Sequence, residues 1–506
     1  MQVSKNLNDS QLFFSSQLFH DVQMSGIFSD SKTFADAIPK RELTFILDAY
    51  ETTIRDDNNA LRAFVMKHFL LPQPMQEPQF SKEDSVASYI HKLWSQLIRR
   101  PDEYTGGSLL PLNYGYVVPG GRFREIYYWD TFFTALGLKE SGQIALINNL
   151  FDNFVHLQKT IGHIPNGNRA YYHSRSQPPV LALLVDLLLE PTTSTDRVKS
   201  FISALDTEYQ FWMRGAQQAK EEGVGKRVVC MPDGELLNRY WDDDATPRPE
   251  SYREDVEATL SMTEAKQADF YVNIRAACES GWDFSTRWLR DAEDLTTIQT
   301  TNIVPIDLNC LLYALEKTIG QLHQRLSSNE DAALWFELAT KRKHAIQKYC
   351  WSSVDGVYFD YDLAQQDHST VYSLAMVLPM YVGLADEQQA KQIASVIQSR
   401  FLKAGGLITT LSDSPQQWDS PNGWAPLHWF AVQGLNHYQY LDLAKDIAMR
   451  WLHTVEHYFD EHHTLMEKYD LVHPAQSATG GEYEVQHGFG WTNGVTQGLY
   501  AMYLPT

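Results

Sequence analysis

The stretch PGGRFREIYYWDTFF, residues 119–133, begins with a proline–glycine–glycine turn and then gathers two arginines, a glutamate, two tyrosines, a tryptophan and an aspartate. Neither the 3.6-residue period of an amphipathic helix nor the alternation of a half-buried strand describes it. So many hydrogen-bonding and aromatic side chains in one place indicate a segment that partly forms the wall of a pocket.

The chain around this stretch is mainly helical by its hydrophobic pattern. Most long segments repeat apolar residues with the period of a helix, and few alternate like a strand. The segments expected to form helices are Gln143 to Lys159, Pro179 to Leu189, Asp196 to Lys220, Ile306 to Leu326, Asn329 to Tyr349, Val371 to Leu384, Glu387 to Leu402, Trp424 to Asn436, Tyr440 to Tyr458 and Trp491 to Tyr503.

These expected helices are of two kinds. Some are amphipathic and charged, such as Glu387 to Leu402, whereas Pro179 to Leu189 and Val371 to Leu384 are apolar nearly all round. Alternation of half-exposed and buried helices is typical of an all-α, double-layered helical barrel, in which outer helices cover an inner ring. No Gly/Ser linker divides the chain, so we expect one barrel domain, residues 61–506, with an N-terminal arm, residues 1–60, packed on it.

Composition and charge narrow the class of ligand. The 506 residues include 42 Lys and Arg against 63 Asp and Glu, which gives a net charge of −21. Nucleic acids and anionic membranes attract clustered basic residues, so this balance argues against both as partners and favours a neutral ligand. The GxGxxG and GxxxxGK patterns are absent from the sequence, so we expect no nucleotide cofactor.

The cysteines and the N-terminus indicate the cellular compartment in which the protein is expected. The 4 cysteines lie far apart without a CxxC pair, so we expect neither a zinc site nor a disulfide framework. The N-terminus lacks the apolar core of a signal peptide. The longest apolar run, Val180 to Leu189, is broken by Asp186 and is too short to span a bilayer. With Met1 as the start, we expect a cytoplasmic protein.

Six loop-like segments mix Trp or Tyr with Asp, Glu, Arg, Asn and Gly. They are PGGRFREIYYWD (119–130), GHIPNGNRAYYHSRSQPP (162–179), PRPESYRED (247–255), ESGWDFSTRW (279–288), QWDSPNGWAP (417–426), and MEKYD (466–470) leading to TGGEYEVQHGFGWTNG (479–494). Carbohydrate binding needs this mixture, because sugar rings offer an apolar face for stacking and hydroxyls that suit bidentate Arg and carboxylate groups. One such segment alone is more often a helix cap or a turn. Six together favour a polar, neutral ligand.

Hydrolysis of a glycosidic bond needs two carboxyl groups, one of them an acid with a raised pKa. The candidates include Glu125, Asp130, Glu250, Asp283, Asp419, Glu467 and Glu482. Asp283 lies between Trp282 and Phe284, which fits an acid kept protonated by apolar surroundings. The residues alone do not select its partner.

A catalytic metal site is the alternative to a pair of catalytic carboxyl groups. HTVEH (453–457) matches the H-x-x-E-H metalloprotease pattern. On a helix from Tyr440 to Tyr458, however, Ala448, Trp451 and Val455 lie on the buried face and both histidines on the solvated one. A pair of surface histidines is therefore the prediction, and no metal is expected.

The motifs resemble those of the trehalase family, the inverting α,α-trehalose hydrolases. PGGRFREIYYWDTFF and QWDSPNGWAP look like the family's two signature segments, and GHIPNGNRAYYHSRSQPP, ESGWDFSTRW, EKYD and GGEY…GFGWTNGV follow in the family's order. FSDSKTFADAIPK (28–40) is similar to the family's DSKTF stretch. The likeness covers nearly the whole chain, and it implies an (α/α)6 barrel with the site at one mouth.

The resemblance also implies roles for particular residues. The general acid would be Asp283 and the general base Glu467. The substrate-binding residues would be Arg122, Trp129, Asp130, Asn166, Arg175, Ser176, Gln177, Arg248, Glu250, Gly281 and Glu482. Trp418 and Trp424 are similar to residues near the family's pocket. In the opening stretch, we expect Phe123, Ile126, Phe132 and Phe133 to lie in the core, and Arg124 and Glu125 to form an ordinary ion pair.

Two departures from the family pattern concern the last segment. The glycine run before Glu482, ATGGEY, is short, and His487 stands where an acidic residue is common. The first predicts a stiffer closing loop and the second a shifted pH dependence. The calcium-binding extension of some fungal members is absent from the sequence, so no metal requirement is expected.

The sequence therefore predicts a monomeric enzyme that hydrolyses α,α-trehalose to two glucose molecules with inversion, without a cofactor. Two alternatives stay open. The protein could be another helical-barrel glycosidase that acts on a different glucoside, or a sugar-binding protein without activity. The presence of both candidate catalytic carboxylates disfavours the second.

Overall fold

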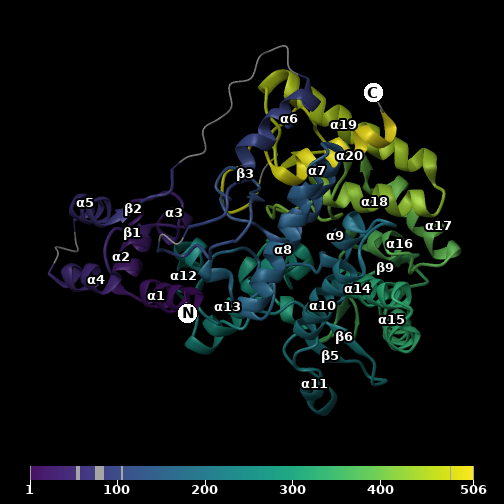
Figure 1. Ribbon diagram of the computed structural model, residues 1–506, viewed down its shortest axis with the longest axis horizontal. Helices are drawn as coiled ribbons and strands as arrows, with labels where there is room; N and C mark the ends of the chain where they lie inside the picture. The colour runs from purple at the N-terminus through teal and green to yellow at the C-terminus, as the bar shows by residue number, and fades with distance from the viewer. Residues whose placement is uncertain (1, 53–56, 74–84, 104–105, 479, 505–506) are drawn as a thin grey trace.

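A closed ring of helices forms the centre of the computed structural model (Figure 1), which describes residues 2–52, 57–73, 85–103, 106–478 and 480–504. In chain order, the inner helices are α7 (Tyr128–Glu140), α9 (Leu181–Leu188), α14 (Ile306–Arg325), α16 (Leu378–Tyr381), α18 (Ala425–His437) and α20 (Gly490–Tyr503). Each contacts the next, and α20 contacts α7, so the ring closes. Most residues of these helices are buried, in agreement with their apolar sequences.

A second layer of helices covers the ring. Each outer helix comes directly before, or leads by a long loop to, an inner one: α6 (Val86–Leu97), α8 (Ile144–Ile161), α10 (Thr195–Trp212), α15 (Asn329–Cys350), α17 (Glu387–Val396) and α19 (Leu441–His462). Helix α8 packs on α7 and α9, α10 on α9 and α14, and α19 on α18 and α20. Each outer helix buries one face and exposes the other. The prediction of a double-layered (α/α)6 barrel is confirmed.

Three expected helices are shorter than their apolar patterns suggested. Asp196 to Lys220 divides into α10 and α11 (Ala216–Glu222), because Gly215 between them has φ 91°. In Val371 to Leu384, the four-residue 3₁₀ turn Leu374–Val377 precedes α16, whose first turn contains Pro379; a proline starts a helix but cannot continue one. Helix α17 ends at Val396 and continues as a single π-helical turn, Ile397–Phe401.

Within the barrel, the pattern analysis missed α6, α7, α12 (Tyr252–Thr259) and α13 (Glu264–Ser280), and it named no helix of the N-terminal arm. Helix α7 begins inside the opening stretch and is buried on all sides over Tyr128 to Leu138, so it has no apolar stripe. Helix α13 buries Arg275 and Glu279 along with its apolar residues, which hides the helical period. Such helices can be recognised only when the neighbours that bury them are known.

The strands are short and lie in the loops. The antiparallel pairs are β1 (Ile38–Pro39) with β2 (Phe69–Leu70), β3 (Ile98–Arg99) with β4 (Tyr116–Val117), β5 (Val228–Cys230) with β6 (Leu236–Asn238), β8 (Trp351–Ser352) with β9 (Val357–Tyr358), β12 (Leu402–Lys403) with β13 (Gly406–Leu407), and β14 (Asn422–Trp424) with β15 (Lys468–Asp470). β10 (Tyr361–Asp362) lies between β7 (Ile303–Val304) and β11 (Asp367–His368). In the part of the chain that is described, no helix is both long and apolar enough to cross a membrane.

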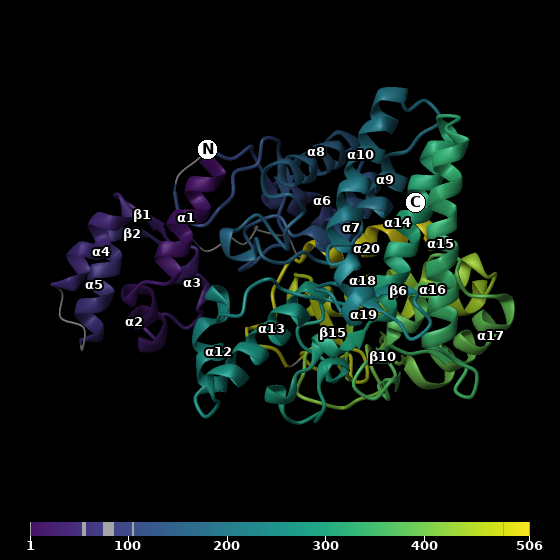
Figure 2. The ribbon, with the colours of Figure 1, turned by 90° about the horizontal axis from the view of Figure 1, so that it is seen from below.

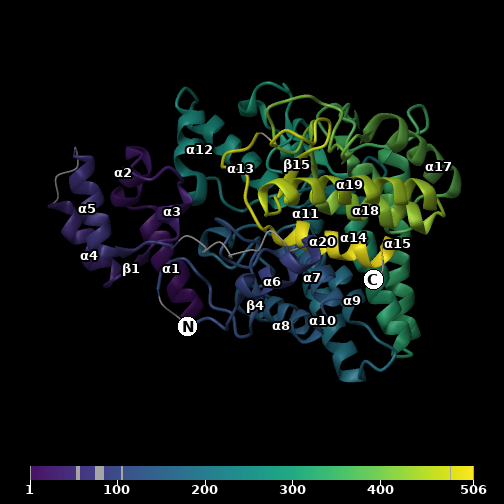
Figure 3. The same ribbon diagram turned by 90° about the horizontal axis from the view of Figure 1, so that it is seen from above.

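The N-terminal helices form a separate group at one side of the barrel, next to α12 (Figures 2 and 3). They are α1 (Gln2–Phe14), α2 (Gln17–Ser25), α3 (Lys32–Ala35), α4 (Leu43–Glu51) and α5 (Asn58–His68). Their hydrophobic cluster runs from Phe13 to Phe69 and includes Tyr127, Tyr171 and Tyr172 of the barrel. The expected boundary between residues 60 and 61 falls within α5, so we propose that this unit, the arm, ends after β2. Residues 1 and 53–56 of the arm, and Thr479 of the short glycine run, lie outside the described residues.

A buried ionic network joins the arm to the barrel. Lys32 Nζ lies 2.5 Å from Asp36 and 2.8 Å from Glu125, and Arg169 Nε donates to Glu125 at 3.0 Å. The Tyr171 hydroxyl donates to Asp36 at 2.6 Å. Among the described residues, the ion pairs of Glu125 are thus with Lys32 and Arg169. The expected pair of Arg124 with Glu125 is wrong, because the arm supplies a buried cation that the local sequence does not reveal.

Candidate active site

The residues expected to bind the ligand converge at one mouth of the barrel. Trp129 and Asp130 are on the first turn of α7, Arg248 and Glu250 lie just before α12, and the others lie in long loops that lead into inner helices. The loop before α9 contributes Asn166, Arg175 and Gln177, and the segment between α13 and α14 contributes Asp283. Because all the inner helices approach this mouth with the same end, distant loops meet there.

Two neighbouring cavities, which share lining residues, occupy this mouth. The inner one, of about 80 Å³, is lined by eleven of the expected residues: Arg122, Trp129, Asp130, Asn166, Arg175, Gln177, Arg248, Glu250, Gly281, Asp283 and Glu482. The outer one, of about 570 Å³, shares Arg122, Glu250 and Glu482 with it. Aromatic rings, including those of Tyr127, Tyr172 and Trp491, line the inner cavity together with these polar groups. This arrangement suits a small polyhydroxylated ligand.

Glu467 is fully buried just before β15. Neither of its carboxylate oxygens has a hydrogen-bond partner among the described residues. Its main chain is fixed, since its N–H donates to Gln486 O at 3.0 Å and its carbonyl accepts the Trp491 indole N–H at 2.9 Å. Burial raises the pKa of Glu467 to about 7, although the charges of Lys468 and Arg122 oppose the rise. The backbone of Glu467 is therefore fixed, while its carboxyl group has no hydrogen-bond partner among the described residues.

Asp283 follows the end of α13 and lies in the inner cavity. Burial raises the pKa of its carboxyl to about 7, and the charge of Glu482 adds to the rise while Arg248 and Arg175 oppose it. The Gln417 side chain donates to the Asp283 carbonyl, and Lys468 Nζ donates to the same glutamine at 2.9 Å. These contacts fix the backbone of Asp283 against the segment that carries Glu467.

The structure separates the candidate carboxylates into two groups. Asp419 is buried and accepts hydrogen bonds from Ser285, Thr286, Thr410 and Ser414, so it holds loops together, as Glu125 holds the arm. Asp130 is buried in the cavity, and its pKa rises well above the ordinary range because of burial and the charges of Asp283 and Glu467. Asp130, Asp283 and Glu467 have no ion-pair partner among the described residues, which fits groups that act on a ligand.

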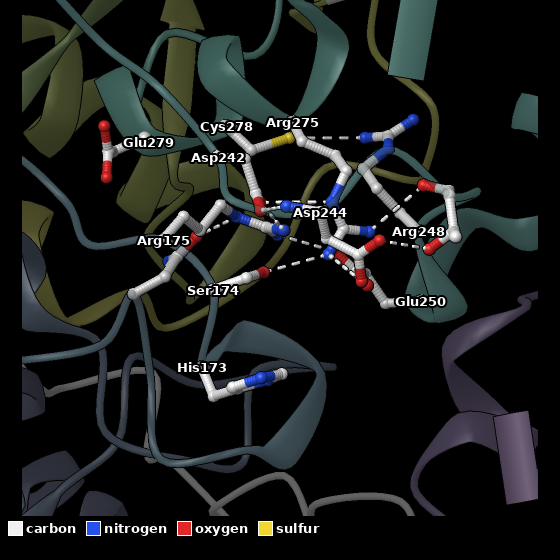
Figure 4. Close-up of polar contacts among 12 residues, drawn as sticks. His173, Ser174, Arg175, Asp242, Asp244, Arg248, Glu250, Arg275, Cys278 and Glu279 are labelled. Carbon is white, nitrogen blue, oxygen red and sulfur yellow. Dashed lines mark hydrogen bonds and ion pairs between the residues drawn. The ribbon is translucent and has the colours of Figure 1, made fainter. Parts of the chain in front are cut away.

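Glu250 and Arg175 belong to a buried network around Asp242 (Figure 4). Arg175 donates from Nη2 to Glu250 at 2.7 Å, from Nη1 to Asp242 at 3.3 Å, and from Nε to Asn166 at 2.9 Å. On its other side, Asp242 accepts from Arg275 Nε at 3.1 Å. All the Arg175 nitrogens are thus engaged, and its charge keeps the Glu250 pKa below the ordinary range despite burial.

Arg248 forms a second buried fork. Its Nη2 donates to Asp255 at 2.6 Å and to Glu482 at 2.9 Å, and its Nη1 lies 3.4 Å from the Cys278 sulfur. Because Glu482 belongs to the loop before α20 and Arg248 to the segment before α12, the fork joins two walls of the cavity. Bidentate pairing of this kind fixes orientation as well as position.

Arg122 is held from both flanks. Its Nε and Nη2 donate to the two carboxylate oxygens of Asp30 at 2.9 and 2.8 Å, and its backbone N–H donates to Gln486 Oε1 at 2.7 Å. The ring centroid of Tyr483 lies 4.6 Å from its guanidinium carbon. Asp30 belongs to the arm, so the arm reaches the candidate site.

The tryptophans form a stack behind the cavity. The rings of Trp418 and Trp424 lie parallel with centroids 4.0 Å apart, and Trp282 stacks on Trp418 at 5.3 Å. Trp418 and Trp424 line neither cavity, and Trp418 packs against Trp129 with ring centroids 6.1 Å apart, so they support Trp129 from behind. Among the residues predicted from the opening stretch, Ile126, Phe132 and Phe133 are buried in the core and Phe123 is partly buried against it.

Gly281 is required by its conformation and by its neighbour. Its φ is 73°, and a Cβ at this position would lie 3.0 Å from the Trp129 ring. The glycine therefore lets α13 end directly against Trp129 and turns the chain so that Asp283 enters the cavity.

The remaining predicted residues lie as follows. Gln177 accepts the Trp129 backbone N–H at 3.0 Å. Ser176 does not line the inner cavity: its hydroxyl donates to the Ile164 carbonyl at 2.6 Å, and its N–H to Glu279 at 2.8 Å. His487 is exposed at the surface. His453 and His457 are exposed on α19 while Ala448, Trp451 and Val455 are buried, as the helical pattern predicted. No cluster of three metal-ligating side chains occurs within the described ranges.

Several residues at the site were not singled out from the sequence: Asp30, Asp242, Asp255, Arg275, Gln417 and Tyr483. Asp30 lies in the DSKTF stretch that was noticed only as a family motif. Asp242 stands in a run of three aspartates that looks like a solvated turn. Their importance comes from partners far away in the chain, such as Arg275 for Asp242.

The barrel and its buried, unpaired carboxyl groups define a class of enzyme, the (α/α)6-barrel glycoside hydrolases. The chain belongs to the trehalase family, whose model matches residues 26–503. Both the family and the glycoside hydrolase class are as the sequence motifs predicted.

Solved structures agree with this assignment. The chain is 26% identical to the neutral trehalase Nth1 from Saccharomyces cerevisiae, with a TM-score of 0.65 over 83% of this chain and 80% of that one. It is 17% identical to a GH63 mannosylglycerate hydrolase from Thermus thermophilus in complex with Tris and D-glycerate, with a TM-score of 0.56 over 82% of this chain and 99% of that one. The second likeness concerns the fold alone.

Proposed function

We propose that the protein hydrolyses α,α-trehalose to two glucose molecules with inversion at the attacked carbon. Asp283 acts as general acid and Glu467 as general base. The observation that carries the proposal is that Asp283 lines the inner cavity while Glu467 is fully buried close enough for their charges to interact, and that neither carboxyl group has an ion-pair partner among the described residues. Membership of the trehalase family supports trehalose as the substrate.

The reaction needs one water molecule and one proton from the enzyme. Protonated Asp283 donates its proton to the bridging oxygen as the bond from that oxygen to the anomeric carbon breaks. Ionised Glu467 takes a proton from water as the water oxygen bonds to the same carbon from the opposite ring face. Asp283 ends ionised and Glu467 protonated, and exchange with solvent restores both. An inverting site of this kind requires the two carboxyls about 6.5–9.5 Å apart.

Other groups would bind the sugar rather than react. Asp130 has a pKa raised well above its ordinary range by burial, so at neutral pH it can donate a hydrogen bond to a hydroxyl as well as accept one. The charge of Arg122 favours the ionised form of Glu467. Water exclusion by Trp129, Tyr172 and Trp491 strengthens these interactions. We also propose that the enzyme is monomeric; its cytoplasmic location stays a prediction of the sequence.

The direct test is glucose release from trehalose by the purified protein, with other glucose disaccharides beside it. Asp283→Asn and Glu467→Gln should each lower kcat by about 10²–10⁴-fold. Glu461→Gln, on the exposed end of α19, is the matched control and should keep full activity. Preference for another disaccharide would favour a different glucosidase, and trehalose binding without turnover would favour a sugar-binding protein.

A further inference from the structure

The contact between Asp30 and Arg122 joins two parts of the chain that the sequence separates widely. Both carboxylate oxygens of Asp30 accept from the guanidinium, at 2.8 and 2.9 Å. The Asp30 Oδ1 also accepts the Lys32 backbone N–H at 2.8 Å. A bidentate pair fixes the plane of a guanidinium, whereas a single contact leaves it free to rotate.

The segment that carries Asp30 is itself fixed to the barrel. The Ser31 hydroxyl donates to Glu254 at 2.9 Å, and the Gln23 amide donates to the Pro249 carbonyl at 3.1 Å. Lys32, the next residue but one, is buried in the ionic network with Glu125. The Asp30 carboxylate is thus presented to Arg122 by a rigid support.

The geometry leaves one end of Arg122 for a ligand. Asp30 takes Nε and Nη2, while Nη1 has no hydrogen-bond or ion-pair partner in the part of the chain that is described. Arg122 lines both the inner and the outer cavity. The two N–H groups of Nη1 are therefore available where the cavities meet.

We propose that Asp30 of the arm is a positioning residue for substrate binding, which holds the Arg122 guanidinium so that Nη1 meets a sugar hydroxyl. This inference rests on the proposed function. It makes the arm part of the active site, because the barrel supplies Arg122 but the arm supplies the carboxylate that orients it. Tyr483 packs on the face of the same guanidinium, so the plane is fixed from two directions.

A double-mutant cycle on trehalose hydrolysis tests the proposal. Asp30→Ala should lower kcat/KM about tenfold or more, mainly by raising KM, since it leaves the catalytic carboxyls in place. In an Arg122→Ala background, the same change should alter kcat/KM less than twofold, because the residue through which Asp30 acts is gone. Asp30→Asn, which keeps one acceptor oxygen, should recover part of the loss.

Ser31→Ala is the matched control. It removes one of the contacts that fix the segment but leaves the bidentate pair of Asp30 with Arg122 intact, so its KM should rise much less than that of Asp30→Ala. Thermal unfolding of every variant separates a folding defect from a binding defect. If the Asp30→Ala variant does not fold, Asp30→Asn replaces it in the double-mutant cycle.

Two results would overturn the proposal. One is an Asp30→Ala variant within twofold of an active wild type. The other is an equal loss in both backgrounds, which would mean that Asp30 only docks the arm. Wild-type protein that releases no glucose from trehalose contradicts the proposed function instead, so the two failures are distinguishable.

Discussion

Asp283, on the wall of the inner cavity, and the fully buried Glu467 lie close enough for the charge of Asp283 to raise the pKa of Glu467. Burial is the larger cause of the shift in both and brings each pKa to about 7. Because the two pKa values are similar, they do not by themselves show which group is the acid and which is the base. The neighbouring charges distinguish the two groups. Lys468 and Arg122 favour the charged form of Glu467, whereas Glu482 favours the neutral form of Asp283.

The pH dependence of kcat/KM should therefore be a narrow bell centred near pH 7. Below that pH Glu467 becomes protonated and loses its ability to act as base, and above it Asp283 loses the proton that it must donate. Activity should fall about tenfold per pH unit on each side. Initial rates across pH 5 to 9 check this. A flat profile over that range would contradict the assignment of these two groups.

Removal of either carboxyl charge should stabilise the protein at alkaline pH. A carboxyl whose folded-state pKa is raised contributes stability below its unfolded pKa, and that contribution is lost as the pH rises through the folded value near 7. Asp283→Asn and Glu467→Gln should thus raise the Tm at pH 8 by about 1 °C or more, but not at pH 4. An unchanged or lowered Tm at pH 8 would show that the charges are compensated in the folded state.

Gly281→Ala should damage both stability and activity. The left-handed φ of 73° costs about 1–3 kcal/mol for an alanine, and the added Cβ would press on Trp129 at 3.0 Å. The push displaces Trp129 and Asp283 together, so kcat/KM should fall.

Gly142→Ala is the control for backbone strain alone. Its φ of 70° is nearly the same, but no atom lies within 4 Å of the added Cβ. It should lose stability and keep activity. Equal activity losses in the two variants would refute the steric explanation.

Asp242→Asn should weaken substrate binding, although the Asp242 side chain does not itself line the cavity. Asp242 accepts from both Arg175 and Arg275, and removal of one member of a buried ionic network costs about 3–5 kcal/mol of unfolding free energy. Arg175 would lose its orientation, so KM should rise.

Asp244 offers the comparison for this substitution, because it pairs with the same Arg275 at 3.5 Å and its side chain is 37% exposed. Asp244→Asn should cost about 0–1 kcal/mol. Chemical denaturation and steady-state kinetics measure both effects. If the two variants behaved alike, burial of the network would be irrelevant to the site.

The sequence was informative wherever local pattern carries the information. The alternation of apolar and amphipathic helices predicted the two layers, and the resemblance of the loop motifs to the trehalase family implied eleven of the residues that line the inner cavity. It failed where a residue takes its role from a distant partner. Helix α13 was hidden because Arg275 and Glu279 are buried in ion pairs. Glu125 was paired with Arg124 in the prediction because its actual partner, Lys32, comes from the arm. Trp418 and Trp424 could be placed near the pocket, but only the packing shows that they support it from behind.

The anomeric form of the glucose released is the most direct measurement of the central claim, attack by a Glu467-activated water while Asp283 protonates the bridging oxygen. Proton NMR in the first minutes of trehalose hydrolysis, before mutarotation, distinguishes the possible outcomes. The account predicts α- and β-glucose in equal amounts, because only the attacked ring inverts. α-Glucose alone would demonstrate retention and would contradict the roles assigned to Asp283 and Glu467.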